Sequence, residues 1–379
     1  MRIGIDCRKI YDVQKNEGAG VARYIFHLVK NLLAIDQNNE YVLFCHGDLG
    51  HETIHKVRGG NARVKIVKVQ RAESRIPFWP NHVRFASVLR KEKLDWVIFP
   101  ANIIPLFYRG RSLVVIHDLA IYQHPEWFPG RQWFARQVLV PRSVRRAAAV
   151  VCVSENTKKD LLAIFRVKEE KVFAIYPGVA VKADYLPEET NNVLEKYGIT
   201  DGYVLYLGTI EPRKNILNLI KAFSAFIFEN EEAKVKLVIA GARGWKYQPV
   251  LDELGESNRR LVSSRIKYVG KVSNRERNIL LKNCLAFIYP SYYEGFGFPV
   301  AEAMALGVPV ITSDNSSLRE IVADAAVLID PDDTTALRRA LKAVLNDKVL
   351  RYQLISRGQE RVKLFDWRVS AAKILKIIQ

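Results

Sequence analysis

The segment LAFIYPSYYEGFGFPVAEAMALGVPVITSD (285–314) predicts one strand, one helix and a second strand. The runs LAFIYP (285–290) and VPVITS (308–313) are short and apolar, as buried strands are. Between them a Gly-rich loop leads into a helical pattern, with Pro299 at a first helical position that proline tolerates well. A unit of this kind predicts a parallel sheet covered by helices.

The same alternation of apolar runs and helical patterns extends over the whole chain. The runs are 2–6, 41–45, 63–69, 95–99, 112–116, 148–154 and 171–176 in the first half, and 203–208, 235–241, 266–270, 285–290, 308–313 and 326–330 in the second. Residues 177–201 interrupt the rhythm with a loop and a new start. We therefore predict an α/β fold of two doubly wound domains, residues 1–180 and 181–361. The last segment predicts an amphipathic helix with Trp367, Ile374 and Ile377 on its apolar side.

Length and composition limit the class of protein. A chain of 379 residues suits two globular domains, and 49% hydrophobic with 26% charged residues excludes a disordered or fibrous chain. No apolar run approaches 18 residues, and the start MRIGID is expected to be a strand rather than a signal peptide. Four distant cysteines without a CxxC predict a reducing, cytoplasmic location and argue against zinc fingers or a disulfide framework.

The net charge of +18 is concentrated in the first half of the chain. Residues 1–180 hold 29 basic and 16 acidic side chains, a net charge of +13. Two stretches, 71–93 and 127–146, mix basic residues with aromatic ones. Such stretches suit an anionic membrane surface, where each Lys or Arg contributes about 1 kcal/mol; the alternative is a solvated face with aromatics turned to the core. No helix-turn-helix, RNP or zinc spacing supports a nucleic-acid partner.

Two candidate sites lie in the first half, where predicted strands end. Gly18 and Gly20 precede a helical pattern, so that free N–H groups could face a phosphate. The GxG lacks the third glycine of a dinucleotide fingerprint, which argues against NAD, and a plain turn is the alternative. His117 and Asp118 directly follow the run 112–116, so this polar pair is a site candidate at the carboxyl end of a strand.

The second half carries two further candidates. EPRKN (211–215) fills the turn after the run 203–208, where Arg213 and Lys214 could neutralise a diphosphate, although charged turns are common. Glu294 lies in the Gly-rich loop and Glu302, eight residues later, is expected in the first turn of the helix. The two carboxylates could hold hydroxyls at opposite ends of one polyol ligand; capping the helix is the alternative. The one D-x-D, 330–332, predicts a helix-capping loop rather than a metal site.

Several of these segments resemble the retaining family-4 glycosyltransferases. EGFGFPVAEAMALGVPVITSD (294–314) resembles their Glu-x7-Glu signature, EPRKN their diphosphate-binding turn, EGAGVARY (17–24) their N-terminal glycine loop and IHDL (116–119) their active-site His segment. The loop reads GAG where many relatives have two adjacent glycines. Order and spacing agree over nearly the whole chain, including FDW (365–367), and the nearest branch is that of bacterial polysaccharide mannosyltransferases and related glucosyltransferases. The resemblance implies a GT-B fold, two Rossmann-like domains facing across a cleft, with residues 362–379 returning to the N-terminal domain.

The resemblance also implies a role for each candidate residue. Glu294 would bind donor-sugar hydroxyls and Glu302 the ribose, while Arg213 and Lys214 would hold the diphosphate and stabilise the leaving group. Gly20 would bring its loop to the phosphates, and His117 would contact the sugar. The remaining donor-binding candidates are Gly18, Asp118, Gly241, Gly297, Phe298, Pro299 and Val300.

The implied activity is hexose transfer with retention of configuration, without metal or cofactor. The expected donor is GDP-mannose, with UDP-glucose second, and the expected acceptor is a glycan or lipid-linked glycan at the cytoplasmic face of the membrane. We expect the acceptor hydroxyl to attack the same face of the sugar from which the diphosphate leaves, with assistance from the departing phosphate. The two glutamates are not expected to act as the acid and nucleophile of a glycoside hydrolase. Alternatives are a nucleotide-sugar hydrolase or epimerase on this fold, a non-catalytic sugar-binding relative, and a basic nucleic-acid-binding protein.

Overall fold

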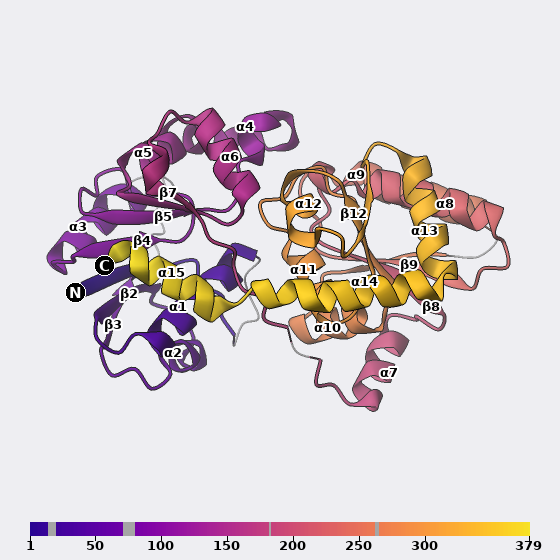
Figure 1. Ribbon diagram of the computed structural model, residues 1–379, viewed down its shortest axis with the longest axis horizontal. Helices are drawn as coiled ribbons and strands as arrows, with labels where there is room; N and C mark the ends of the chain where they lie inside the picture. The colour runs from indigo at the N-terminus through magenta and orange to yellow at the C-terminus, as the bar shows by residue number, and fades with distance from the viewer. Residues whose placement is uncertain (14–19, 71–79, 182, 262–264) are drawn as a thin grey trace. The chain divides into compact units, whose positions relative to one another are not determined.

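The computed structural model describes residues 1–13, 20–70, 80–181, 183–261 and 265–379. The chain folds into two compact units, each built around one parallel sheet (Figure 1). The first unit comprises Met1–Pro125, Pro129–Gly178 and Phe365–Gln379, and the second comprises Glu126–Phe128 and Val179–Leu364. Among the described residues, no helix is both long and apolar enough to cross a membrane.

The sheet of the first unit has the strand order β3-β2-β1-β4-β5-β6-β7, and all its neighbouring strands are parallel. Its strands are β1 Arg2–Asp6, β2 Glu40–His46, β3 Val64–Val69, β4 Trp96–Phe99, β5 Ser112–Ile116, β6 Ala149–Cys152 and β7 Val172–Ala174. Its α-helices are α1 Gly20–Ile35, α2 His51–Arg58, α3 Phe85–Lys91, α4 Ala120–Gln123, α5 Val140–Arg146, α6 Glu155–Ile164 and α15 Trp367–Ile378. The order reverses between β1 and β4, which is where ligands bind in open α/β sheets.

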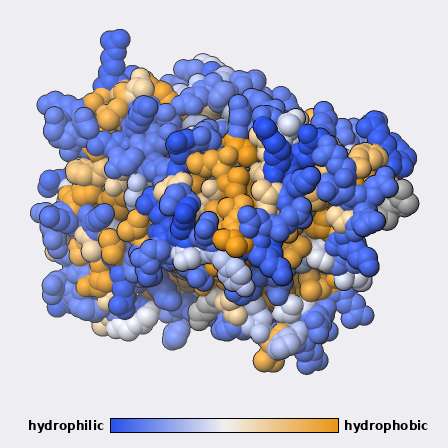
Figure 2. Space-filling view, turned by 45° about the vertical axis from the view of Figure 1, so that its right-hand side comes forward, coloured by the Kyte–Doolittle hydropathy of each residue, from blue (hydrophilic) through white to orange (hydrophobic). Residues whose placement is uncertain are grey.

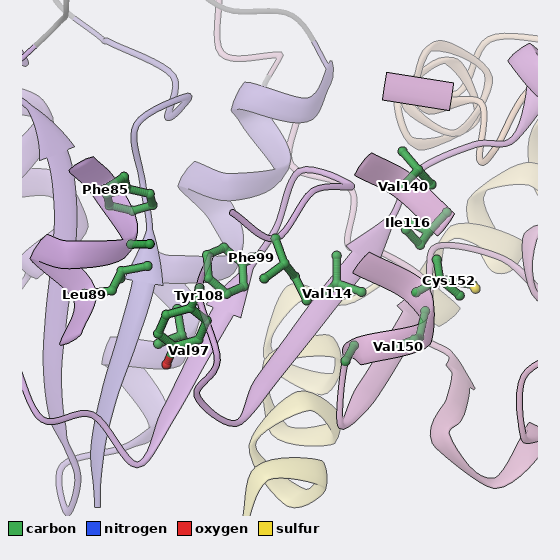
Figure 3. Close-up of a cluster of buried hydrophobic side chains, with 14 of the residues drawn as sticks. Phe85, Leu89, Val97, Phe99, Tyr108, Val114, Ile116, Val140, Val150 and Cys152 are labelled. Carbon is green, nitrogen blue, oxygen red and sulfur yellow. The ribbon is translucent and has the colours of Figure 1, made fainter. Parts of the chain in front are cut away.

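The central strands of this sheet supply every second side chain to one hydrophobic cluster (Figure 3). The contributing residues on β4, β5 and β6 are Val97, Phe99, Val114, Ile116, Val150 and Cys152. Helices α3 and α5 cover them with side chains such as Phe85 and Val140. Because both faces of a parallel sheet are covered in this way, its strands are continuously apolar in sequence.

The C-terminal helix α15 packs along α1 in the first unit (Figure 1). It begins at Trp367 because Asp366 accepts hydrogen bonds from the backbone N–H groups of Arg368 and Val369. Trp367 and Ile374 are buried as predicted, but Ile378 is buried in the position expected for Ile377. Residues four apart share a helix face, so Ile378 continues the face of Ile374.

The sheet of the second unit has the order β10-β9-β8-β11-β12-β13 and is also parallel. Its strands are β8 Gly202–Leu207, β9 Val235–Ala240, β10 Ile266–Gly270, β11 Ala286–Tyr289, β12 Val310–Ser313 and β13 Val327–Ile329. Its α-helices are α7 Pro187–Lys196, α8 Ile216–Glu229, α9 Gln248–Arg260, α10 Asn274–Asn283, α11 Phe298–Ala305, α12 Ser316–Val322, α13 Thr334–Asn346 and α14 Lys348–Arg361. The order reverses between β8 and β11.

The predicted fold class, two doubly wound parallel α/β domains, is confirmed. Each of the thirteen apolar runs coincides with one strand of the described chain. The segment 177–201, expected to be a loop followed by a new start, contains helix α7.

The surface drawn in Figure 2 is mostly hydrophilic, with hydrophobic side chains in separate patches.

Candidate functional site

The candidate site of the second unit lies where β8, β11 and β12 end. These strands are neighbours in a parallel sheet, so the segments that follow them meet at one edge. After β8, Pro212–Lys214 form a single 3-10 turn. Asn215 ends the turn with φ of 55°, a conformation that asparagine tolerates better than most residues, and its side chain donates to the Pro331 carbonyl. The asparagine of EPRKN thus has a structural reason to be there.

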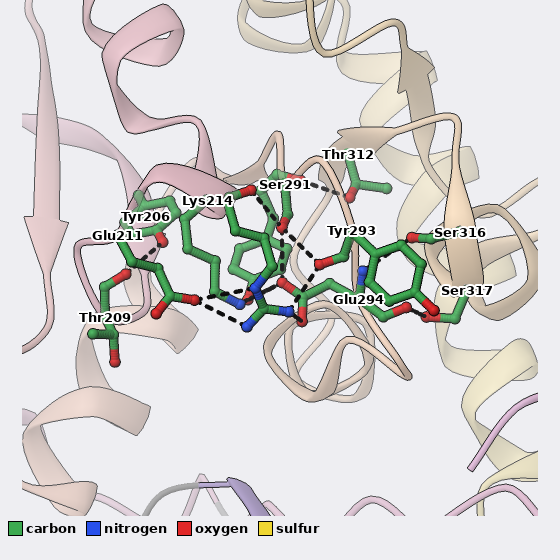
Figure 4. A network of polar contacts seen from close by, with 12 residues as sticks. Tyr206, Thr209, Glu211, Lys214, Ser291, Tyr293, Glu294, Thr312, Ser316 and Ser317 are labelled. Atoms are coloured by element: carbon green, nitrogen blue, oxygen red, sulfur yellow. Dashed lines mark hydrogen bonds and ion pairs between the residues drawn. The ribbon is translucent and has the colours of Figure 1, made fainter. Parts of the chain in front are cut away.

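Glu294 is the centre of a buried polar network (Figure 4). Its Oε1 accepts hydrogen bonds from the Lys214 ammonium, from the Tyr289 hydroxyl at 3.0 Å and from the Ser291 hydroxyl at 2.8 Å. The Lys214 ammonium also donates to the Tyr289 hydroxyl at 2.8 Å. Lys214 and Glu294 are 80 residues apart in sequence, and the parallel sheet brings them into direct contact.

Arg213 joins the same network from the side. Its guanidinium donates to Glu211 at 2.9 Å, to the carbonyl of Tyr293 at 2.9 Å and to Glu294 Oε2 at 3.3 Å. The carboxylate of Glu294 therefore faces a cation on each of its two oxygens. Glu211, which the sequence analysis placed in the turn without a role, is the residue that fixes the guanidinium of Arg213.

The two cations decide the ionisation of Glu294. Burial alone would raise its pKa, but Lys214 and Arg213 outweigh burial and hold the pKa at about 2. Glu294 is therefore a carboxylate at neutral pH. A carboxylate only accepts hydrogen bonds, which suits it to hydroxyl groups and to the two cations beside it.

The backbone of the Gly-rich loop is tied to the start of α12. The N–H of Glu294 donates to the Ser316 hydroxyl at 3.0 Å, and the Ser317 hydroxyl donates to the carbonyl of Glu294 at 2.8 Å. Gly297 then takes a φ of 88° before α11 begins, and a Cβ built there would lie 2.8 Å from Leu318. The loop needs glycine at this point for backbone conformation as well as for space.

Glu302 does not join this network. Helix α11 begins at Phe298, with Pro299 in its second position, so Glu302 lies in the second turn and not in the first as expected. Its buried carboxylate forms an ion pair with Arg277 of α10. The structure thus gives the two glutamates of the Glu-x7-Glu segment different cationic partners, Lys214 with Arg213 for one and Arg277 for the other.

Replacing Arg277 tests whether it holds Glu302 in place. If Glu302 binds the ribose of a nucleotide sugar, as the resemblance implies, we expect Arg277→Ala to raise the KM for that donor about tenfold with little change in kcat, because a hydrogen bond between charged groups contributes about 1.5–3 kcal/mol. Steady-state kinetics with donor varied provides the measurement. Arg275→Ala, on the same helix but with an exposed side chain paired to Glu189, is the control. Equal donor KM values for the two variants would show that Arg277 does not contribute to donor binding.

In the first unit, His117 lies directly after β5 and is buried. Its Nε2 is 2.7 Å from the Pro100 carbonyl, and its ring meets the ring of Tyr24 edge-to-face with centroids 4.8 Å apart. A carbonyl only accepts, so the hydrogen bond assigns the hydrogen to Nε2 and leaves Nδ1 as an acceptor in the neutral ring. Burial lowers the pKa of His117, which favours that neutral form.

The other candidates in the first unit are Asp118, Gly20 and Gly18. Asp118 is half-buried beside His117, and its charge opposes the lowering of the His117 pKa. Gly20 is the first residue of α1 and is exposed. Gly18 lies outside the described residues.

Of the remaining candidates, Gly241 and Val300 have clear structural roles. A Cβ built on Gly241 would lie 1.9 Å from the carbonyl oxygen of Gly208, so only glycine fits there. Val300 is fully buried and its N–H donates to the Gly297 carbonyl at 3.0 Å, whereas Phe298 and Pro299 are half-buried. Their binding of a donor stays a prediction.

The D-x-D segment organises a loop. Asp330 accepts from the N–H of Asp332, and Asp332 accepts from the Tyr292 hydroxyl at 2.9 Å. The cap of the following helix α13 is the next residue, Asp333, whose side chain accepts from the N–H of Ala336.

Sequence reasoning missed Tyr289, Ser291 and Arg277. Tyr289 and Ser291 lie in the quoted segment, at and just after the end of β11, so their position at the carboxyl end of a strand was an available signal. Arg277 lies in the middle of α10, where one arginine among other charged residues gives no signal.

Two family models match successive parts of the chain. The family model described as "Glycosyltransferase Family 4" matches residues 18–182, and that described as "Glycosyl transferases group 1" matches residues 190–361. The O-antigen chain mannosyltransferase B of Escherichia coli is 30% identical over 373 residues, which cover 92% of each chain. The present chain belongs to the family-4 glycosyltransferases.

Two solved structures share the fold of this family-4 glycosyltransferase. Sucrose-phosphate synthase from Thermosynechococcus elongatus matches with a TM-score of 0.76 and 19% identity, covering 99% of the present chain and 97% of its own. Anabaena HepE in complex with UDP-glucose matches with a TM-score of 0.74 and 17% identity, covering 99% and 98%. The GT-B assignment of the glycosyltransferase is thereby confirmed.

Proposed function

We propose that this glycosyltransferase moves mannose from GDP-mannose to a glycan or lipid-linked glycan, with retention of configuration and without a divalent metal. The observation that carries the proposal is the buried contact of Lys214 and Arg213 with Glu294 at the switch point of the second sheet. The choice of mannose is supported by the relative that is named an O-antigen chain mannosyltransferase. UDP-glucose is the second candidate donor, supported by HepE, whose structure contains it.

The geometry supports separate roles for the two cations, Lys214 and Arg213, and for the carboxylate of Glu294. The Lys214 ammonium has three hydrogens, and among the described residues two acceptors bind it, Tyr289 and Glu294. The third hydrogen is available to a phosphate oxygen of the donor. In this proposal Lys214 and Arg213 stabilise the negative charge that develops on the leaving diphosphate, an electrostatic contribution that requires no metal. Glu294 accepts hydrogen bonds from hydroxyls of the transferred sugar.

The acceptor hydroxyl attacks the anomeric carbon on the face from which the diphosphate departs. The bond between the anomeric carbon and the diphosphate oxygen breaks, the bond to the acceptor oxygen forms, and the acceptor proton passes to the departing phosphate. His117, with Nδ1 as an acceptor, contacts a sugar hydroxyl in this proposal. Glu302 holds the ribose, at a distance from the anomeric carbon, and does not act as a nucleophile.

Donor choice is tested by thermal stabilisation and by turnover. We expect GDP and GDP-mannose to raise the unfolding temperature more than UDP and UDP-glucose do, since a ligand that binds only the folded state stabilises it. Turnover of GDP-mannose in EDTA should match turnover in added Mg²⁺. Preferential stabilisation by UDP-glucose would transfer the proposal to that donor, and loss of turnover in EDTA would refute the metal-free mechanism.

We also propose that the basic first unit docks on an anionic membrane surface, where a lipid-linked acceptor would lie. Of the stretch 127–146, Trp133 is 60% exposed and Phe134 is 38% exposed, with Arg142 and Arg145 exposed nearby in sequence. Trp133 and Phe134 are therefore not turned to the core, which supports the membrane interpretation over a solvated face. The other two aromatics of the stretch, Trp127 and Phe128, are half-buried and pack on Tyr292 and Trp245 of the second unit.

The described part of the other stretch differs. Phe85 is fully buried in the core with the guanidinium of Arg8 over its ring, while Arg90 and Lys91 are exposed. Residues 71–79 of that stretch lie outside the described residues. In residues 80–93 the solvated-face alternative accounts for the pattern.

Vesicle sedimentation tests the docking. We expect the protein to bind phosphatidylglycerol vesicles and not phosphatidylcholine vesicles, and Arg142→Ala with Arg145→Ala to weaken binding about 25-fold, since each contributes about 1 kcal/mol. Trp133→Ala should weaken binding as well, whereas Tyr352→Ala, an exposed aromatic of the second unit, should not. Equal binding to both vesicle types would argue against electrostatic docking.

A further inference from the structure

The indole of Trp367 occupies a tightly enclosed place at the start of α15. A Cβ built on Gly178 would lie 2.3 Å from the backbone nitrogen and 2.4 Å from Cγ of Trp367. The helix start is held there as well, because the Ser370 hydroxyl donates to the Tyr176 carbonyl at 2.5 Å and Phe365 meets Tyr176 edge-to-face. Trp367 therefore has a fixed position against the first unit.

This indole contacts two aromatic side chains of α1. The centroids of the Trp367 and Tyr24 rings are 5.2 Å apart, and the angle between the ring planes is 70°. The centroids of the Trp367 and His27 rings are 5.5 Å apart, and these rings are stacked with an angle of 17° between their planes. Tyr24 is in turn buried and meets His117 edge-to-face. A continuous series of packed rings thus connects the C-terminal helix to the candidate site histidine.

The position of the His117 ring depends on two supports. On one side its Nε2 donates to the Pro100 carbonyl, and its backbone N–H donates to the Asn102 side chain at 2.9 Å. On the other side lies the Tyr24 ring, which Trp367 contacts. Close-packed interiors transmit displacements of this kind, because rings in contact cannot move independently.

The indole N–H of Trp367 does not stabilise the fold through a hydrogen bond to any described residue. Nε1 of Trp367 is buried and has no hydrogen-bond partner among the described residues. A buried donor without a partner is destabilising, and phenylalanine would fill part of the same space without that cost. What the indole adds is a second ring, which lets one residue contact Tyr24 and His27 together.

We infer that Trp367 is a positioning residue that fixes the ring of His117 through Tyr24, so that the C-terminal helix sets the geometry of the sugar-binding site. The inference rests on the proposed role of His117. Trp367 would thereby contribute to the reaction although it lies in the C-terminal helix, whose other buried residues pack in the first unit.

The test compares Trp367→Phe with Ile374→Ala, a packing defect two turns further along the same buried face. NMR of histidine-labelled protein reports the ring signals and tautomer of His117, which a His117→Gln variant assigns. We expect Trp367→Phe to keep the unfolding temperature near that of the wild type, to shift the His117 signals and to lower kcat about tenfold. Ile374→Ala should lower the unfolding temperature and leave the His117 signals unchanged.

Unshifted His117 signals in Trp367→Phe, or a kcat equal to that of the wild type, would overturn the inference. The proposed role of His117 is tested separately by the activity of His117→Gln. If that variant turns over normally, the sugar contact is refuted, whereas the NMR comparison still shows whether Trp367 positions the ring.

Discussion

Lys214→Ala is expected to lower kcat for mannose transfer by about 10³-fold. The ammonium is buried between Tyr289 and Glu294, and in the proposed mechanism it stabilises the leaving diphosphate. Removing one preorganised donor to a developing negative charge costs about 10²–10³ in kcat elsewhere, and Lys214 carries a full charge in a buried setting. Initial rates at saturating GDP-mannose give the measurement, with circular dichroism to establish that the variant is folded.

Two variants make the test specific. Lys221→Ala removes an exposed lysine from α8 and should leave kcat unchanged. Lys214→Arg keeps the charge but not the compact geometry of an ammonium, so we expect partial recovery relative to alanine. If Lys214→Ala is folded and turns over within about threefold of the wild type, the assignment of the leaving-group site is incorrect.

Glu294→Ala is expected to reduce the free energy of unfolding by about 3–5 kcal/mol, in addition to abolishing transfer. It removes the carboxylate between two buried cations, Lys214 and Arg213, and breaking a buried pair from one side leaves the charge uncompensated. Urea unfolding of each variant measures the loss. The double variant with Lys214→Ala should be less destabilised than the sum of the two singles by about 0.5–3 kcal/mol. Strict additivity would show that the pair does not couple.

The pH dependence of this contribution has a definite sign. The pKa of Glu294 is about 2 in the folded protein and about 4.3 in an unfolded chain, so the unfolded state takes up the proton first as pH falls. The stabilisation is complete above about pH 5 and is lost as pH decreases toward 2. The difference in unfolding free energy between wild type and Glu294→Gln should therefore shrink over that range. A difference that stays constant from pH 6 to pH 3 would contradict the low pKa.

The strands and the cluster around Glu294 were predictable for the same reason. Continuous runs such as SLVVI identify buried parallel strands, and parallel strands place the segments after them at one edge. Lys214 and Glu294 each follow such a strand, so their proximity follows from topology. The sequence could not show that they pair directly, because that depends on the turn at Asn215 and on the anchoring of the loop by Ser316.

Contacts between helices were less accessible to sequence reasoning. The pairing of Arg277 with Glu302 depends on how α10 and α11 face one another, and periodicity gives only the buried face of each. The same limit applies to the C-terminal helix, where the contact of Trp367 with Tyr24 joins residues from opposite ends of the chain. Exposure of Trp133 also depends on tertiary structure, since aromatic residues are usually turned inward.

Proton NMR of the first product formed from GDP-α-mannose tests the central claim most directly, because it reports the anomeric configuration of the new linkage. Transfer through same-face attack, with Lys214 and Arg213 on the leaving diphosphate, predicts an α-linked mannose. A β-linked product would contradict the retaining mechanism and with it the roles assigned to the cluster around Glu294.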